Sequence, residues 1–219
     1  MNENELRREM VRITKKLDEL GLNRGTSGNL SVRFGDGMLI TPSGMGAEGL
    51  TEDDIVFVQT DGTSRGRWQP SSEWLFHRDI LAQRAEFGAV VHTHSIAATA
   101  LACLRKDIPP FHYMIALFGG DNIRCANYAT FGTQELSDHA LLALKDRKAC
   151  LLANHGMIAA GTDLAEAFRN TVEVESLSEM YLRALQAGEP VLLSVQEFRE
   201  AQQRFAGYGQ AGEAKHRPD

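Results

Sequence analysis

The stretch Val90-Val91-His92-Thr93-His94-Ser95 places two histidines at alternate positions behind an apolar pair. In a β-strand, residues two positions apart leave the same face, so both imidazoles could bind one metal ion. Imidazole is a good ligand for zinc, copper, iron and nickel. A single histidine at the edge of an apolar run is more often a hydrogen-bonded core residue. The pair therefore predicts a metal site only if other residues complete it.

The composition is that of an ordinary globular protein. The chain has 219 residues, of which 43% are hydrophobic and 24% charged, which suits one well-buried domain. The net charge of −6 argues against nucleic acid as the main partner, although a local pocket for a phosphorylated small molecule stays open. The apolar runs are too short to span a membrane, and the start Met1-Asn2-Glu3-Asn4-Glu5-Leu6 does not resemble a signal peptide. We therefore expect a cytoplasmic protein with no membrane partner.

The three cysteines, Cys103, Cys125 and Cys150, are scattered and form no Cys-x-x-Cys motif. Neither a disulfide framework nor a zinc knuckle is indicated. We expect all three to be small buried hydrophobic residues.

Helical and extended patterns alternate without the strict βαβ order of a doubly wound sheet. Helices are predicted over residues 5–20, 70–85, 97–104, 164–186 and 195–205. Strands are predicted over residues 30–33, 37–40, 55–59 and 150–153 and around His92, with a hairpin turn at Asp61-Gly62. We expect an α/β, or α+β-like, fold with a central mixed or mostly antiparallel sheet flanked by helices. Residues 1–210 are predicted to form one domain, and residues 211–219 a flexible tail.

Two further residues could complete a metal site. His155 ends an apolar run and precedes Gly156, a position from which a side chain can reach into a cleft. Glu73 stands at a predicted helix start. It is either a first-turn acid that favours the helix dipole or a weakly held ligand that becomes a base when substrate displaces it. One carboxylate and three imidazoles would close a tetrahedral zinc sphere.

The other four histidines have simpler interpretations. His77 follows Glu73 by four residues and is interpreted as a packed or capping residue. His139, on an amphipathic helix, and His216, in the tail, are expected to be solvent-exposed. The role of His112 stays open.

Three short segments are rich in glycine or hydroxyl side chains: Gly28-Asn29, Thr41-Pro42-Ser43-Gly44 and Ser71-Ser72. Each alone is typical of a turn or a helix cap. Together they have the composition of an anion-binding site, because peptide N–H groups and hydroxyls can bind phosphate without a lysine.

The motifs run in order from about residue 20 to 156 and resemble the class II aldolase/adducin-head family. The matching segments are Gly21-Leu22-Asn23, Gly28-Asn29, Asp36-Gly37-Met38-Leu39-Ile40-Thr41-Pro42, Pro70-Ser71-Ser72-Glu73-Trp74, Val90-Val91-His92, Ile108-Pro109, His112-Tyr113-Met114-Ile115-Ala116, Tyr128-Ala129-Thr130-Phe131-Gly132-Thr133 and His155-Gly156. The helical C-terminal part is a looser match.

The resemblance implies a specific set of site residues. One zinc ion per subunit would be held by Glu73, His92, His94 and His155. The resemblance also implies a homotetramer with its sites between subunits, Tyr113 being the acid donated by the adjacent chain. The substrate phosphate would be bound by Gly28, Asn29, Ser43, Gly44, Ser71 and Ser72, and the pocket would be lined by Phe131 and Tyr208.

The activity implied by this family is reversible cleavage of a ketose 1-phosphate to dihydroxyacetone phosphate and an aldehyde. L-fuculose 1-phosphate, which would release L-lactaldehyde, is the substrate expected first. Zinc would stabilise the enediolate, Glu73 would move the proton at its carbon, and Tyr113 would exchange the proton on the aldehyde oxygen.

Other activities occur on the same fold. A sugar-phosphate 4-epimerase would carry aspartate where this chain has Glu73, and a 3-oxo-tetronate 4-phosphate decarboxylase would carry lysine where it has Ser72. Both differences favour the aldolase. A methylthioribulose phosphate dehydratase and an aldolase acting on 5-deoxyribulose 1-phosphate stay open. An adducin-like interaction module would lack the metal ligands, all four of which are present here.

Overall fold

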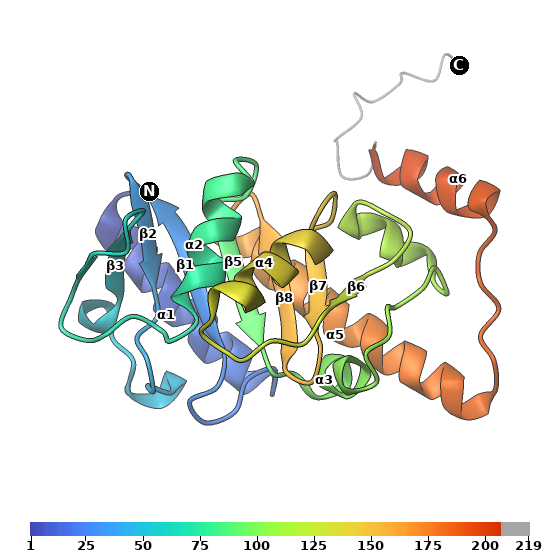
Figure 1. The fold of residues 1–219 in the computed structure, drawn as a ribbon, viewed down its shortest axis with the longest axis horizontal. Helices are drawn as coiled ribbons and strands as arrows, with labels where there is room; N and C mark the ends of the chain where they lie inside the picture. Colours follow the sequence, from blue (N-terminus) through green and yellow to red (C-terminus); the bar gives the residue numbers. More distant parts are fainter. Residues whose placement is uncertain (207–219) are drawn as a thin grey trace, which may run out of the picture.

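The computed structural model describes residues 1–206 and shows one sheet with helices on both faces (Figure 1). Eight strands form the sheet, in the order β4-β3-β2-β1-β5-β8-β7-β6. Their bounds are β1 (Asn29–Phe34), β2 (Gly37–Ile40), β3 (Val56–Gln59), β4 (Ser64–Arg65), β5 (Ala89–Thr93), β6 (Arg124–Ala126), β7 (Ala149–Leu152) and β8 (Gly156–Gly161). All neighbouring pairs are antiparallel except β6 and β7, which confirms the predicted mixed, mostly antiparallel sheet.

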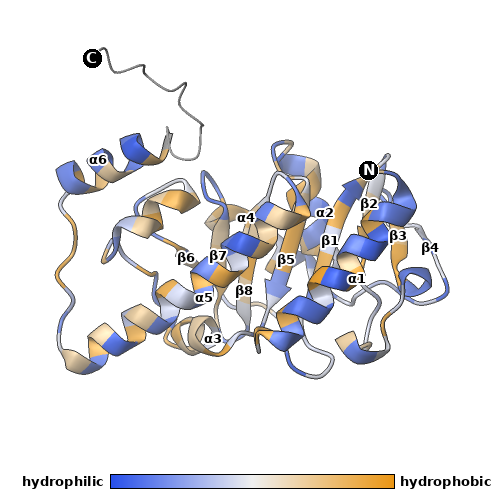
Figure 2. Cartoon of the chain, turned by 180° about the vertical axis from the view of Figure 1, so that it is seen from behind, coloured by the Kyte–Doolittle hydropathy of each residue, from blue (hydrophilic) through white to orange (hydrophobic). Residues whose placement is uncertain are grey.

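The helices divide between the two faces of the sheet. They are α1 (Glu3–Glu19), α2 (Trp74–Gln83), α3 (Ile96–Cys103), α4 (Gln134–Ala143), α5 (Leu164–Ala187) and α6 (Val195–Ala206), with short 3₁₀ segments η1 (Ala47–Gly49), η2 (Glu52–Asp54) and η3 (Tyr113–Phe118). Helices α2 and α4 contact each other and cover one face. Helices α1, α3 and α5 cover the other, and α6 packs on η3 (Figures 1 and 2).

Apolar side chains on the two faces make up the core. Met38, Phe76 and Ile80 belong to the cluster between the sheet and α2 and α4, and Met10 and Leu17 of α1 belong to the cluster on the opposite face. Figure 2 shows the central strands as mostly hydrophobic and α1 as mixed, which is the pattern of a helix that buries one side. The buried sheet is therefore a rigid support for any residue at a strand end.

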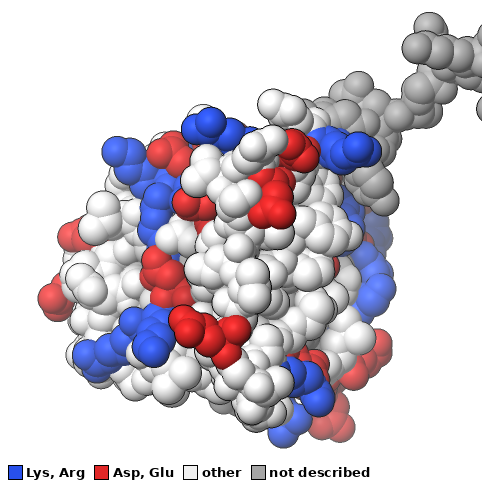
Figure 3. All heavy atoms as spheres, turned by 90° about the vertical axis from the view of Figure 1, so that its right-hand side faces the viewer, with Lys and Arg blue, Asp and Glu red and all other residues white. Residues whose placement is uncertain are grey.

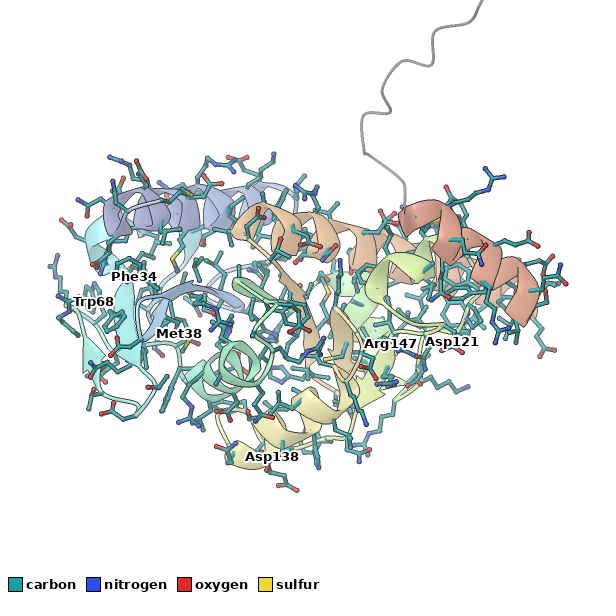
Figure 4. All side chains as sticks on the ribbon, turned by 90° about the horizontal axis from the view of Figure 1, so that it is seen from above. Phe34, Met38, Trp68, Asp121, Asp138 and Arg147 are labelled. Atoms are coloured by element: carbon teal, nitrogen blue, oxygen red, sulfur yellow. The ribbon has the colours of Figure 1, made fainter. Side chains whose placement is uncertain are left out.

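Labelled side chains illustrate this division (Figure 4). Met38 is 2% exposed and points into the interior, whereas Asp138 points away from α4. Near the β6 end of the sheet, Arg147 and Asp121 form an ion pair of 3.1 Å. On the face at the right-hand end of Figure 1, basic and acidic groups are interspersed around an uncharged centre (Figure 3).

Several local predictions need correction. Helix α2 begins at Trp74 and not at residue 70, because residues 71–73 form a turn with a hydrogen bond from Trp74 N–H to Ser71 O. Strand β8 was not predicted, since Gly-Met-Ile-Ala-Ala-Gly consists mostly of glycine and alanine, which are depleted in strands. Cys103 is exposed, against the expectation that all cysteines are buried. The predicted hairpin at Asp61-Gly62 is confirmed, because β3 pairs with β4 across it.

Two predictions lie outside the described residues. The domain boundary at residue 210 and the tail 211–219 both fall in the part that the structure does not describe. Within residues 1–206, no helix combines the length and the apolar character needed to span a bilayer.

Candidate functional site

Three histidines and one glutamate converge at one edge of the sheet. His92 is the fourth residue of β5, His94 follows the end of that strand, and His155 lies in the turn between β7 and β8. Glu73 immediately precedes α2. Each residue offers one ligand atom, and these four atoms lie within 4.8 Å of one another. The structure thus brings together the four ligands that the sequence predicted.

The three imidazoles are arranged almost symmetrically. The ring centroids of His92, His94 and His155 are 4.9 Å apart in every pair, with interplanar angles of 70–76°. His92 Nε2 lies 3.0 Å from His94 Nε2 and 3.2 Å from Glu73 Oε2. His155 Nε2 lies 3.1 Å from Glu73 Oε1. The four polar groups therefore point at a common centre.

The hydrogen bonds behind this cluster fit a divalent cation. His92 Nδ1 lies 2.9 Å from Met157 O, a carbonyl that can only accept, so the neutral ring carries its proton on Nδ1 and a lone pair on Nε2. That lone pair faces the Glu73 carboxylate, whose buried Oε1 makes no hydrogen bond within the described chain. Acceptors that face one another repel unless a cation lies between them. Three imidazoles and one carboxylate form a donor set typical of zinc and related metals.

Electrostatics favour the deprotonated forms that metal ligands need. Burial, then the neighbouring His92 and His155, lower the pKa of His94 to about 4, against the opposing pull of Glu73. Burial alone would raise the pKa of Glu73. In the metal-free site, attraction to His92 and His155, when either ring carries an extra proton, outweighs burial and holds the pKa of Glu73 well below its usual range. At neutral pH the cluster therefore offers a carboxylate and a neutral imidazole at His94.

A tight turn presents His155 to the other two histidines. Asn154 adopts a left-handed conformation with φ of 55°, and His155 N–H donates to Leu152 O at 3.0 Å. A Cβ atom at Gly156 would lie 2.4 Å from Thr93 O and 2.9 Å from His94 Cδ2. Glycine is therefore required after His155 so that the turn can approach β5. The sequence analysis gave Gly156 no role, and an obligatory glycine cannot be recognised before its neighbours are known.

Glu73 is the N-cap residue of α2, but its side chain is held by other neighbours. The side chain makes no cap hydrogen bond and Glu73 lies before the first helical turn, which corrects the interpretation as a first-turn acid. Instead Asn29 Nδ2 donates to Glu73 Oε2 at 2.9 Å, and Glu73 N–H donates to Ser71 Oγ at 3.3 Å. The carboxylate is thereby directed at the histidines. His77 is fully buried, as its interpretation as a packed residue predicted, and it contacts Asn29.

A cavity of about 330 Å³ opens beside this cluster. It is lined by three members of the cluster and by all six residues predicted to bind phosphate. These residues are Glu73, His94 and His155, together with Gly28, Asn29, Ser43, Gly44, Ser71 and Ser72. Thr26, Ser27, Tyr128 and Asn154 also line it, although the sequence analysis assigned them no role. Tyr128 lies within one of the segments that match the family, and this match was the sequence signal that could have identified it as a site residue.

Anion binding in this cavity would rely on peptide and hydroxyl dipoles. No lysine or arginine from residues 1–206 lines it. The N–H groups of Ser43 and Ser71 are already bonded to Gln69 O and Thr41 O. Those of Gly44 and Ser72 have no partner in the described part of the chain. Residue 44 has a φ of 69°, a backbone conformation that glycine readily adopts. Gly44 and Ser72 are therefore the free N–H donors of the two loops.

The predicted aromatic residues differ in position. Phe131 lines the cavity and is 64% exposed. Tyr113, in η3, is 52% exposed, stacks on Phe205 at 6.0 Å and does not line the cavity. Tyr208 lies outside the described residues. Phe131 is thus the one predicted aromatic residue that this chain brings to its own cavity within residues 1–206.

Comparisons with known proteins agree with this geometry. Residues 8–182 match the family model described as "Class II Aldolase and Adducin N-terminal domain". A 5-methylthioribulose-1-phosphate/5-deoxyribulose-1-phosphate aldolase from Rhodospirillum rubrum is 55% identical over 204 residues, which cover 93% of this chain and 92% of that protein. An L-fuculose phosphate aldolase from Escherichia coli is 47% identical over 210 residues, covering 95% and 98%.

A solved structure gives the same result for the fold. A structure of L-fuculose 1-phosphate aldolase superposes with a TM-score of 0.89 at 41% identity and covers 92% of this chain and 96% of that one. The family model spans most of the chain, and the relatives are matched over nearly their whole length. The chain therefore belongs to the class II aldolase and adducin N-terminal domain family.

Proposed function

We propose that this protein is a metal-dependent aldolase that reversibly cleaves a ketose 1-phosphate to dihydroxyacetone phosphate and a short aldehyde. One observation carries the proposal: a single cavity is lined both by the histidine and glutamate cluster and by the glycine and serine loops. A phosphate bound at those loops would bring the adjoining ketone towards the cluster. Such positioning is a large part of what an aldolase must supply.

The chemistry follows from the groups present. In cleavage, the bond between C3 and C4 breaks, C4 becomes the aldehyde as its hydroxyl loses a proton, and the electron pair forms the enediolate of dihydroxyacetone phosphate. A zinc ion held by Glu73, His92, His94 and His155 would polarise the ketone and stabilise the developing negative charge. Glu73 would deliver the proton to C3 of the enediolate and remove it in the reverse direction.

The second proton transfer is assigned to Tyr113 of an adjacent subunit. Tyr113 is half-exposed and lies outside the cavity of its own chain, which supports a role in a neighbouring site. We propose a homotetramer in which Tyr113 exchanges the proton on the aldehyde oxygen, with Tyr208 reaching the same pocket.

The candidate substrates share an apolar end. L-fuculose 1-phosphate, expected from the sequence, ends in a methyl group. The substrates named by the Rhodospirillum rubrum relative, 5-methylthioribulose 1-phosphate and 5-deoxyribulose 1-phosphate, end in a methylthio and a methyl group. The side of the cavity formed by Tyr128, Ala129 and Phe131 suits such an end. We therefore propose a ketose 1-phosphate of this kind as the substrate.

A coupled assay tests the proposal. The purified protein is supplied with each of the three ketose 1-phosphates, and dihydroxyacetone phosphate is followed by its NADH-linked reduction, with and without chelator. We expect release from at least one substrate, loss of release after chelation, and recovery with zinc. The values of kcat/KM rank the substrates. No release from any of them, combined with carbon dioxide release from 3-oxo-tetronate 4-phosphate, would overturn the aldolase in favour of the decarboxylase.

A further inference from the structure

A chain of three hydrogen bonds runs from the cavity into the core behind Glu73. Asn29 Nδ2 lies 2.9 Å from Glu73 Oε2, His77 Nε2 lies 2.5 Å from Asn29 Oδ1, and Ser31 Oγ lies 2.7 Å from His77 Nδ1. Ser31 and His77 are fully buried, and Asn29 and Glu73 are 8% and 6% exposed. Each side chain of this relay is therefore largely shielded from water.

All three hydrogen bonds join β1 to α2 or to its N-cap residue. Asn29 and Ser31 are two residues apart on β1 and therefore point to the same face of the sheet. Glu73 and His77 are four residues apart, one at the start of α2 and one a turn later, so both meet that face. His77 also stacks on Phe76, with ring centroids 4.6 Å apart, which restricts rotation of its ring. The relay thus fixes the start of α2 against the start of β1.

The direction of each hydrogen bond follows from the chemistry. A carboxylate only accepts, so Asn29 must turn its NH₂ group to Glu73 and its oxygen to His77. His77 must then donate from Nε2. Burial, which is the main cause, lowers the pKa of His77 to about 3, so the ring is neutral and Nδ1 accepts from the Ser31 hydroxyl. Turning the Asn29 amide round would place its oxygen against the Glu73 carboxylate.

We propose that His77 is a positioning residue: as the Nε2–H tautomer, supported by Ser31, it holds the Asn29 amide so that its N–H donates to Glu73. Asn29, which was predicted to bind the substrate phosphate, therefore also has a second role: one of its N–H groups donates to the Glu73 carboxylate. This inference deepens the proposed function and rests on it only for its kinetic readout. Removal of a group that supports a metal ligand in this way typically costs 10–100-fold in activity or metal affinity.

The first test measures the tautomer and needs no substrate. Long-range ¹H–¹⁵N spectra of deuterated protein carrying ¹⁵N-histidine distinguish Nε2–H from Nδ1–H rings. The signal lost in His77→Gln identifies His77. We expect a neutral Nε2–H ring at neutral pH, with or without chelator. An Nδ1–H ring, or a charged ring, overturns the proposal.

The second test uses kinetics and a matched control. His77→Phe should lower kcat by about 10–100-fold and change KM less, because Asn29 is the one predicted phosphate-binding residue to which the described His77 side chain is bonded. His77→Gln keeps a donor near the position of Nε2 and should restore most of the loss. Ser31→Ala should lower kcat less. Ser137→Ala, which also deletes a fully buried hydroxyl but one bonded to Asp79, should leave kcat near that of the wild type.

The outcomes separate the two proposals. If wild-type protein is active and His77→Phe is equally active, the positioning role is wrong and the aldolase proposal stands. If His77→Phe does not fold, Ser31→Ala against Ser137→Ala decides, and equal kcat values overturn the relay. If wild-type protein cleaves none of the sugar phosphates, the proposed function fails, while the tautomer measurement still tests the relay.

Discussion

Asn29 on β1 and His92 on β5 are directly paired across the antiparallel ladder. The amide of Asn29 donates to Glu73 Oε2, and the same carboxylate oxygen lies 3.2 Å from His92 Nε2. This facing pair therefore supplies one predicted metal ligand, His92, and, in Asn29, the residue that supports a second predicted ligand, Glu73. Because the strands are buried and hydrogen-bonded, they restrict the positions of these side chains, which is the condition for an efficient site.

Replacing His94 with alanine should abolish tight metal binding. A zinc site that keeps two imidazoles and a weakly held carboxylate loses most of its affinity. Elemental analysis of purified His94→Ala should find little metal. His139→Ala is the matched control, because His139 lies on α4 and bonds to Asn127 O away from the cavity. Equal metal content in the two variants would contradict the assignment.

Glu73→Gln should remove most turnover while phosphate binding persists. The amide cannot accept a proton at neutral pH, and loss of a general base typically costs about 10²–10⁴-fold in kcat. The affinity for inorganic phosphate, measured by a binding titration, should change little because the loops that contain Ser43 and Ser71 are intact. Near-normal turnover of Glu73→Gln would show that another group moves the proton.

Gly156→Ala should distort the turn that carries His155. The added methyl would lie 2.4 Å from Thr93 O, so β5 or the turn must shift. We expect a loss of about 1–3 kcal/mol in unfolding free energy and weaker metal binding. Gly49→Ala is the control, since a Cβ there meets nothing within 4 Å. Denaturant unfolding of both variants checks the difference, and equal stabilities would refute the packing argument.

Ser72→Ala should raise KM more than it lowers kcat. The hydroxyl is expected to donate to the substrate phosphate, which is bound in the ground state as in the transition state, so its loss weakens binding by about tenfold or less. Ser64→Ala, an exposed serine on β4, should leave KM unchanged. A large fall in kcat with constant KM in Ser72→Ala would place this residue at the reacting atoms instead.

Acid should destabilise the metal-free protein. Unfolded histidines titrate near pH 6.5, whereas burial lowers the folded-state pKa of His77 to about 3 and of His94 to about 4. Between these values the unfolded state binds more protons, so the unfolding free energy falls as pH decreases from 6.5. The slope for the fully buried His77 is about 1.4 kcal/mol per pH unit, and that for the partly exposed His94 is smaller.

Urea unfolding of chelated protein between neutral pH and about pH 4.5 measures this slope. His77→Gln removes one titrating group and should give a shallower dependence. An identical slope in that variant would show that His77 does not cause the pH sensitivity.

Local patterns were sufficient for much of the fold. The helical spacing of Met10, Ile13 and Leu17 predicted α1, because this period reflects which face is buried, and a short segment bounded by turns predicted β2. Strand β8 was not predicted because its glycines and alanines give little strand signal. The start of α2 was misplaced by the serines before it, whose turn depends on contacts with Thr41 O.

By itself the sequence determined which chemical groups the site contains. The alternate positions of His92 and His94 predicted a shared strand face, and the motifs around Glu73 and His155 indicated the remaining candidate ligands. Only the tertiary structure decided how these groups are held, because Glu73, His77, Asn29 and Ser31 are up to 48 residues apart in their hydrogen-bonded pairs and meet only when α2 packs on β1. The direction of a hydrogen bond depends on both partners, so no local pattern could reveal the relay or the obligatory glycine at position 156.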